Sequence, residues 1–273
     1  MKIALTGATG FVGTALRHAF PDHAVIDRQD DVDAIVAKLQ GVDVAINLAG
    51  APIIKRWTDP YKEVLMNSRI HSTKRLVAAL NQSSVKHFIS TSAIGIYPDN
   101  MRCDESCEAC SDDFLGHLAR KWEQEARHCT LPTTILRFGV ILGVDGGALR
   151  QMLTPFKLGV GGVIGDGKMM TSWIDIEDLV RVYRFVIDNN LDGTFNCVSP
   201  NPVTNRVFTK SLGRVLHRPT VLPIPEFALR IMYGEAASVL TGSKEVYPSA
   251  LEKAGFTFKY PTVDASLGHL LGG

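Results

Sequence analysis

The sequence predicts a doubly wound parallel α/β sheet of the Rossmann type with a smaller C-terminal part, and three features support this fold class. Apolar runs of strand length alternate with segments whose apolar residues recur at helical spacing. A glycine-rich turn joins the first run to the first helical segment. Glycine and proline are denser in the second half, as expected of a cap over a cleft. We therefore expect a sheet domain over 1–150, with segments at about 172–200 returning to it, and a cap over 151–273.

Composition excludes several classes of protein. The 273 residues are 45% hydrophobic, and 29 Lys and Arg against 28 Asp and Glu give a formal net charge of +1. This balance provides no field for nucleic acid or an anionic membrane. No apolar run approaches the roughly 20 residues that cross a bilayer, and no signal sequence precedes the first strand, so we expect a cytoplasmic protein. Five cysteines, an odd number, fit reduced thiols better than a disulfide framework.

The glycine turn lies between a strand at residues 3–5 and a helix at 14–20. Gly7 suits a tight turn, Gly10 lets the backbone approach a pyrophosphate, and Gly13 allows close packing of helix on strand. The helix N-terminus offers amide donors to phosphates. The turn therefore predicts nucleotide binding. The residues expected to contact the cofactor here are Gly7, Thr9, Gly10, Phe11, Val12 and Gly13.

A second strand, 24–28, ends in two charged residues that favour different cofactors. Asp27 would accept hydrogen bonds from a free ribose 2′-hydroxyl and favour NAD(H), whereas Arg28 would pair with a 2′-phosphate and favour NADP(H). We favour NADP(H), because the carboxylate can turn toward solvent, and keep NAD(H) and a solvated surface turn as alternatives.

A helix over 31–40 and a strand over 42–48 follow at a short interval. A doubly wound sheet usually places one more strand before this helix, so that strand is expected to be truncated or absent. Leu48, Ala49 and Gly50 lie at the carboxyl end of the strand, where such sheets bind ligands, and are further cofactor candidates.

The next loop and helix, 61–80, carry polar candidates. Arg56 and Trp57 would suit an anionic or sugar-like substrate, although a surface stack explains such a pair equally well. Farther along, Asn67, Ser68 and Arg69 are better explained by a structural role on the helix face than by ligand binding.

A strand at 85–90 runs into hydroxyl side chains, and Ser92 there would polarise a substrate carbonyl. The loop over 98–113 contains Cys103, Cys107 and Cys110. No second Cys or His pair completes a zinc site nearby, so exposed thiols and no metal are expected.

The remaining elements are inferred from periodicity and punctuation. On the helix predicted at 114–128, His117 and Lys121 are four residues apart and share a face. Strands are expected at 133–137 and 193–198, and helices at 178–189, 205–216, 226–239 and 248–254.

Stretches that match the motifs of a known protein family extend over nearly the whole chain. They are Thr6-Gly-Ala-Thr-Gly-Phe-Val-Gly13, Asn47-Leu-Ala-Gly50, Pro52-Ile53, Arg56-Trp57, Ser90-Thr-Ser-Ala93, Trp122-Glu123, Arg137-Phe-Gly139, Gly146-Gly147, Gly159-Val-Gly-Gly162, Ser172-Trp-Ile174 with Asp178, Phe195-Asn196, Ser199-Pro200, Gly234-Glu235 and Gly255-Phe256. In these the chain resembles the extended short-chain dehydrogenase/reductase superfamily and, within it, an atypical group of NAD(P)-dependent sugar-nucleotide-epimerase-like proteins with a distinctive C-terminal segment.

The resemblance implies site residues and also shows a departure. Typical members carry Tyr-x-x-x-Lys on the helix after the serine strand. If Glu125 takes the place of the usual downstream carboxylate, Lys121 falls at the lysine and His117 at the tyrosine, and this helix has no tyrosine. Lys121 would then bind the nicotinamide ribose. The proton donor is left open between His117, Tyr97, another group, and no chemistry at all.

These observations together predict an NADP(H)-dependent oxidoreductase or epimerase that transfers hydride to or from a small polar or sugar-like substrate. The alternative is a non-catalytic NADP(H)-binding redox-sensing regulator. Phe138 is a further cofactor candidate, and Trp173 joins Arg56 and Trp57 as a substrate candidate. By resemblance alone, the helices at 61–80 and 114–128 would form a homodimer interface.

Overall fold

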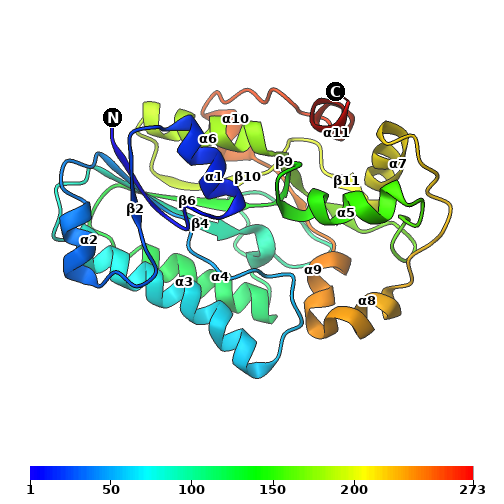
Figure 1. Ribbon diagram of the computed structural model, residues 1–273, viewed down its shortest axis with the longest axis horizontal. Coiled ribbons are helices and arrows are strands. Elements are labelled where there is room, and N and C mark those ends of the chain that lie inside the picture. The colour runs from blue at the N-terminus through cyan, green and yellow to red at the C-terminus, as the bar shows by residue number, and fades with distance from the viewer. Residues whose placement is uncertain (273) are drawn as a thin grey trace.

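The computed structural model describes residues 1–272, and its centre is a six-stranded parallel sheet in the order β10-β6-β4-β3-β1-β2 (Figure 1). Every pair of neighbouring strands in it is parallel, which confirms the doubly wound α/β class. The strands are β1 (Ile3–Thr6), β2 (His23–Ile26), β3 (Val44–Asn47), β4 (His87–Ala93), β6 (Thr133–Phe138) and β10 (Gly193–Cys197).

Helices cover both faces of the sheet, because its strands are apolar on both sides. In β1, Ile3 and Leu5 pack with α1 and α6 on one face, while Ala4 packs with α2, α3 and α4 on the other. These helices are α1 (Phe11–Ala19), α2 (Val32–Lys38), α3 (Asp59–Leu80), α4 (Phe114–Ala126) and α6 (Ile176–Asp188).

The strand order places a topological switch point between β1 and β3. After β2, the chain crosses back and adds β3 on the other side of β1. Connections therefore leave the carboxyl ends of β1 and β3 in opposite directions and open a crevice between them, where sheets of this kind bind ligands. Among residues 1–272, no strand lies beyond β2 in this sheet, so of the two alternatives, a truncated or an absent strand, the structure has the second.

The C-terminal part is mostly helical and packs at one end of the sheet (Figure 1). Its helices are α5 (Gly147–Lys157), α7 (Asn205–Val215), α8 (Glu226–Tyr233), η2 (Gly234–Ala237), α9 (Ser238–Thr241), α10 (Ser249–Lys253) and α11 (Val263–Leu271). Two short pairs connect it to the N-terminal part of the chain: β5 (Arg102–Cys103) with β12 (Glu245–Val246), and β7 (Val140–Leu142) with β9 (Trp173–Asp175). A third pair, β8 (Met170–Thr171) with β11 (Val203–Thr204), lies within the second half of the chain. Another short helix, η1 (Ile94–Ile96), follows β4.

Three expectations for helices need correction. The single helix predicted over 226–239 is interrupted at Gly234, whose φ of 61° ends α8. Helices α5 and α11 were not predicted. Helix α5 begins at a glycine, lacks a side-chain cap and contains Pro155, so it carries few local helix signals.

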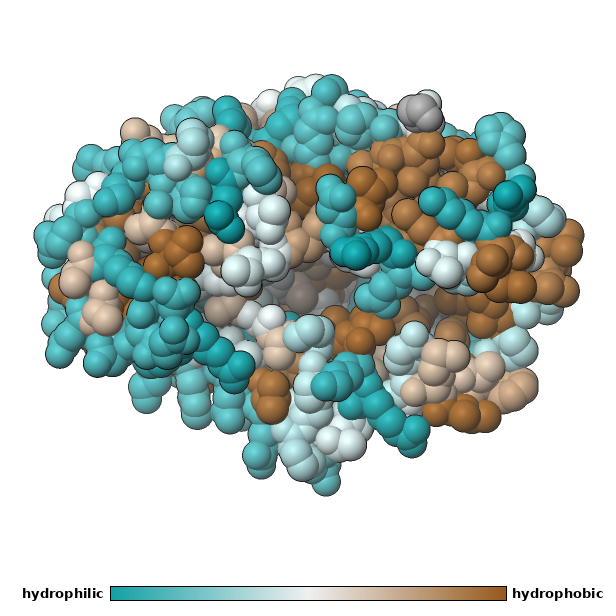
Figure 2. Space-filling view, viewed as in Figure 1, coloured by the Kyte–Doolittle hydropathy of each residue, from teal (hydrophilic) through white to brown (hydrophobic). Residues whose placement is uncertain are grey.

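The surface differs between the two halves, and a hollow lies between them. Figure 2 shows hydrophilic residues over the N-terminal helices, more hydrophobic ones over the C-terminal part, and a hollow near the middle of this face. Within residues 1–272, no helix is both long and apolar enough to span a membrane. The division of the chain at about residue 150 stays a prediction, although β9, α6 and β10 do rejoin the sheet half.

Candidate functional site

The glycine turn forms one wall of the crevice, and close backbone packing requires glycine at two of its positions, Gly7 and Gly13. Gly7 has a φ of 63°, and a Cβ there would lie 2.7 Å from the Leu48 carbonyl oxygen. Gly10 N donates to Gly7 O at 3.0 Å and caps α1. A Cβ at Gly13 would overlap the Gly7 carbonyl oxygen. Only glycine at positions 7 and 13 lets α1 begin directly beneath the turn.

The N-terminus of α1 faces this crevice without a competing anion. Gly10 offers no side-chain cap, and the first turn of α1 has no acidic residue, so its amide donors remain available to a ligand. Thr9 is exposed on the turn, and Val12 packs against the sheet core. The ring of Phe11 lies against Gly146 and Gly147 at the start of α5 and so connects the turn to the C-terminal part.

The opposite wall is held by a buried hydrogen-bond network. Thr6 Oγ1 accepts from the amides of Leu48 and Ala49 at 3.0 and 3.2 Å and donates to Asn47 Oδ1 at 2.8 Å. Asn47 Nδ2 in turn donates to Thr73 Oγ1 on α3 at 2.7 Å. The end of β3, where Leu48, Ala49 and Gly50 lie, is therefore fixed from both β1 and α3.

The charges at the end of β2 are arranged asymmetrically. The carboxylate of Asp27 pairs with Lys38 Nζ at 3.0 Å, and Lys38 also pairs with Asp30 at 2.5 Å. The exposed Arg28 side chain has no ion-pair partner within residues 1–272, and its carbonyl accepts from Arg75 Nη2 at 2.8 Å. Asp27 is thus occupied by a cation, while two guanidinium groups lie beside it.

Ser92 and Tyr97 come together at the carboxyl ends of β4 and β6, inside a buried network. Ser92 Oγ donates to Glu123 Oε1 at 2.7 Å. Arg137 donates to both oxygens of Glu123, at 2.7 and 2.8 Å, and to Tyr97 Oη at 2.7 Å. Tyr97 Oη donates to Asn196 Oδ1 on β10 at 3.0 Å. The network therefore joins α4 to three neighbouring strands of the sheet.

Ionisation in this network follows from burial and pairing. Burial acts to raise the pKa of Glu123, but the hydrogen bonds and charge of Arg137 outweigh it, so the pKa is lowered and the side chain is a carboxylate at neutral pH. Burial raises the pKa of Tyr97 to about 12. Tyr97 is 1% exposed, and its hydroxyl is already paired. In this geometry its phenol stays protonated and turned away from the crevice.

The register of α4 differs from the one expected by resemblance. Glu123, not Glu125, faces the serine strand, whereas Glu125 lies 3.5 Å from His128 at the surface. Residues two apart point about 200° apart around a helix, so this change moves the whole site face. His117 and Lys121 consequently lie on the outer, exposed side of α4, and the His117 ring contacts Arg120 at 2.9 Å.

The inner face of α4 carries apolar residues where the resemblance would place the tyrosine and lysine. One turn before Glu123 lies Ala119, which packs with Ile94 and Tyr97 in a buried cluster. Another turn earlier lies Leu115, whose Cβ is 3.4 Å from the position of a Cβ at Gly95. This face therefore brings neither a phenol nor an ammonium group to the end of β4.

The three proposed substrate contacts have structural roles in this conformation. Trp173 is fully buried in the C-terminal core and donates to Asn201 O at 3.2 Å. Trp57 is 8% exposed, donates to Ile53 O at 2.9 Å and packs 5.2 Å from Phe114. Arg56 Nη1 donates to Ile231 O at 3.3 Å and so holds the C-terminal segment against this loop. Neither tryptophan presents its ring to the crevice.

Phe138 and the cysteines are placed as follows. Phe138, at the carboxyl end of β6, packs edge-on against Tyr183 at 6.4 Å. Cys103 is buried and its sulfur lies 2.7 Å from that of Cys107, so only Cys110 is the exposed thiol that the sequence suggested. In the described part of the chain, no cluster of His, Cys, Asp and Glu could hold a metal ion.

Arg69, for which the sequence favoured a structural role on the helix face, lies at the wall of the crevice. From α3 its guanidinium reaches the end of β3, where a Cβ at Gly50 would lie 3.0 Å from it. It donates to Ala51 O at 3.1 Å and to Leu65 O at 3.3 Å, and lies 5.3 Å over the Trp122 ring. The position of Arg69 in a long polar helix does not indicate that it lies beside the crevice, because only tertiary packing decides which face of the helix meets the end of the strand.

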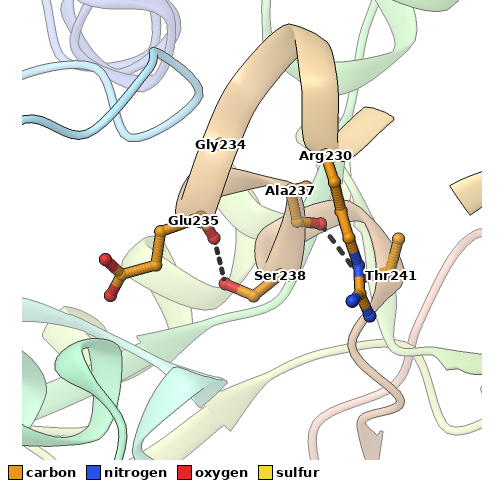
Figure 3. A pocket seen from close by; sticks show the side chains of 6 residues that line it. All are labelled: Arg230, Gly234, Glu235, Ala237, Ser238 and Thr241. Carbon is orange, nitrogen blue, oxygen red and sulfur yellow. Dashed lines mark hydrogen bonds between the residues drawn. The ribbon is translucent and has the colours of Figure 1, made fainter. Parts of the chain in front are cut away.

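A shallow pocket of about 370 Å³ lies in the C-terminal segment, away from the crevice (Figure 3). It is lined by Arg230, Gly234, Glu235, Ala237, Ser238 and Thr241. Its hydroxyls are already used within the segment, because Ser238 donates to Glu235 O at 2.9 Å and Thr241 to Ala237 O at 3.1 Å. The switch-point crevice is therefore the better candidate site.

The parallel sheet, the glycine turn and the crevice at the switch point define a dinucleotide-binding protein of the Rossmann class. More specifically, the chain belongs to the NAD dependent epimerase/dehydratase family, whose model matches residues 3–197. Residues 224–270 match a domain of unknown function, DUF1731. The pocket of Figure 3 and the helices around it fall in that second segment.

Similar proteins align over the whole chain. The chain is 36% identical to "Epimerase family protein SH2119" of Staphylococcus haemolyticus, covering 99% of each protein. It is 33% identical to "Epimerase family protein YfhF" of Bacillus subtilis, covering 99% of this chain and 98% of that one. The crystal structure of human epimerase family protein SDR39U1 (isoform 2) with NADPH is 30% identical, with a TM-score of 0.91 and full coverage of both chains.

Proposed function

We propose that this chain binds NADP(H) at the carboxyl ends of β1 and β3 and acts as an oxidoreductase or epimerase on a small polar or sugar-like substrate. Membership of the NAD dependent epimerase/dehydratase family supports the class of cofactor. The similar human protein SDR39U1 was crystallised with NADPH, which supports the phosphorylated form. The observation that carries the choice of NADP(H) is the pairing of Asp27 with Lys38 beside an unpaired Arg28.

The chain's own residues would hold the cofactor at two anionic points. The first-turn amides of α1 meet the diphosphate, because Gly10 and Gly13 let that backbone come close. Arg28, with Arg75 nearby, meets the 2′-phosphate of the adenosine ribose. When bound, the nicotinamide donates or accepts a hydride.

The chemistry at the substrate end differs from the usual arrangement of the superfamily. Ser92 already donates its proton to Glu123, so its hydroxyl can only accept from a substrate in this conformation. The proton that accompanies hydride transfer therefore comes from water, from the substrate or from a donor outside α4. The lack of a phenol or ammonium group on the inner face of α4 favours the second candidate, a protein that binds NADP(H) without turnover and signals the redox state of the cofactor.

A titration with NADPH and NADH, followed by the fluorescence of the reduced nicotinamide, tests the choice of cofactor. We expect the wild type to prefer NADPH and Arg28→Gln to lose at least about tenfold of that affinity, the size of one charge-assisted hydrogen bond. Lys38→Gln is the matched control. Lys38→Gln removes a neighbouring cation and frees the Asp27 carboxylate. The change in NADH affinity should therefore be larger than the change in NADPH affinity. Equal binding of both cofactors by wild type and Arg28→Gln would contradict the assignment.

Turnover separates the two candidate functions. Purified protein is incubated with NADPH and a panel of aldehydes, ketones and 4-keto sugar nucleotides, and oxidation of the reduced nicotinamide is followed by absorbance. Consumption of NADPH that depends on both protein and substrate supports the enzyme. Tight NADPH binding with no consumption over the whole panel supports the regulator.

A further inference from the structure

Arg69 brings a guanidinium group to the wall of the crevice at the end of β3. Gly50 lies directly against it, since a Cβ there would be 3.0 Å from both Cζ and Nη2 of Arg69. Gly50 follows Leu48 and Ala49, whose backbone lies against Gly7. Arg69 is therefore separated from the glycine turn by one short backbone segment and shares the crevice with the N-terminus of α1.

No carboxylate neutralises this guanidinium within residues 1–272. Its polar contacts are the backbone carbonyls of Ala51 and Leu65, neither of which carries a full charge. Burial lowers the pKa of Arg69 to about 10, so the group remains a cation at neutral pH. Arg137 is the contrast, because there Glu123 reverses the effect of burial and the pKa is raised.

An enclosed cation without a counterion is unfavourable, because the lost hydration is repaid only by pairing. Two carbonyls satisfy part of the guanidinium fork and leave other N–H groups unused. The side chain is still partly exposed, so a ligand can reach it. The guanidinium lies 5.3 Å over the Trp122 ring, and this cation–π contact holds it near the end of β3 before a ligand binds, which reduces the entropy lost on binding.

We propose that Arg69 binds an anionic oxygen group, a carboxylate or a phosphate, of a ligand in the switch-point crevice. The planar fork suits either group, and a Cβ at position 50 would crowd the guanidinium at 3.0 Å and displace it. The anion has two sources, the diphosphate of the dinucleotide or an acidic group on the substrate. The proposal rests on the proposed function in that the crevice must be the ligand site.

The experiment compares full-length wild type, Arg69→Gln and Arg214→Gln. Arg214 is an exposed arginine on α7, paired with Asp264, and its substitution makes the same change in net charge. NADPH affinity is measured by fluorescence titration. Sodium phosphate and sodium malonate are then added to the free and the NADPH-saturated protein at constant ionic strength. Their effects are followed by the thermal unfolding midpoint and by tryptophan fluorescence, since Arg69 lies over the Trp122 ring.

Two outcomes support the proposal and identify the source of the anion. If Arg69→Gln weakens NADPH binding about tenfold or more while Arg214→Gln does not, the anion belongs to the cofactor. If NADPH affinity is kept, but phosphate or malonate stabilises wild type and Arg214→Gln and not Arg69→Gln, the anion belongs to the substrate. Unchanged NADPH affinity, together with equal anion effects on all three proteins, would overturn it.

Gly50→Ala covers the case in which Arg69→Gln does not fold. The alanine keeps the arginine and its charge but displaces the guanidinium, so it should weaken the same ligand by the same readout. Gly50→Ala with wild-type binding of NADPH, phosphate and malonate would count against the proposal. The free protein keeps the two proposals separable, because anion binding at Arg69 is measurable even if NADPH does not bind.

Discussion

Removing Glu123 should destabilise the fold far more than removing a surface carboxylate. The side chains of Glu123 and Arg137 are only 6% and 11% exposed, and both carboxylate oxygens accept from Arg137. In Glu123→Leu, Arg137 stays buried with only the Tyr97 hydroxyl as partner, and Ser92 loses its acceptor. Breaking a buried pair in this way costs about 3–5 kcal/mol of the free energy of unfolding.

A double-mutant cycle shows how much of that loss comes from the unpaired charge. Glu123→Leu with Arg137→Met removes both ions, so we expect the double variant to recover about 1–3 kcal/mol relative to the sum of the single losses. Urea unfolding of the ligand-free protein, followed by circular dichroism, measures each free energy. Glu125→Leu is the control on the same helix and should lie within about 0.5 kcal/mol of wild type.

The pH dependence of the same variants provides an independent check. The folded-state pKa of Glu123 is below its ordinary 4.5, so its contribution is fully present above that pH and is lost as pH falls below it. The difference between wild type and Glu123→Leu should therefore be constant near neutral pH and shrink under acid conditions. A loss under about 1 kcal/mol at neutral pH, or a difference that grows under acid, would refute this account of the network.

The remaining predictions concern His87 and the glycine turn. Burial lowers the pKa of His87, which bonds Thr134 Oγ1 at 2.8 Å, below its ordinary 6.5. The unfolded chain therefore gains the proton first, stability falls as pH drops through that value, and His87→Gln should flatten this part of the urea-derived profile. Gly7→Ala should lose about 1–3 kcal/mol and NADPH affinity, because its Cβ would strike the β3 end. Gly41→Ala, with a φ of 70° and nothing within 4 Å, should lose stability alone, and equal NADPH binding by both variants would contradict the role of the turn.

The structure also limits what Trp57 and Trp173 can do. Trp57 and Trp173 were candidates for substrate contacts because aromatic side chains are common in such sites. Both instead hold cores together: Trp57 between α3, α4 and the DUF1731 segment, and Trp173 in the cluster beneath α5 and α7. A tryptophan in a sequence signals a large buried area at least as often as a ligand, and burial cannot be inferred from the residue type.

The sequence by itself determined the features that depend on local order. The six strands, the five helices that cover the sheet (α1, α2, α3, α4 and α6) and the glycine turn follow from apolar periodicity and from the backbone freedom of glycine, which act over a few residues. That one strand is truncated or absent followed from counting the chain between 28 and 42. The predicted strands agree with the observed sheet because a strand that is buried on both faces of a parallel sheet must consist mainly of apolar residues.

Only the tertiary structure decided which side chains meet at the crevice. Glu123 and Glu125 are two residues apart on one helix, and nothing local shows which of them faces β4. The choice moved His117 and Lys121 to the solvent side. Arg69 likewise gained its position from the packing of α3 on β3, 19 residues after Gly50 in sequence but in contact with it in space. Long-range packing decides which face of a helix meets the sheet and which side chains contact one another. The order of residues along the chain does not contain that information.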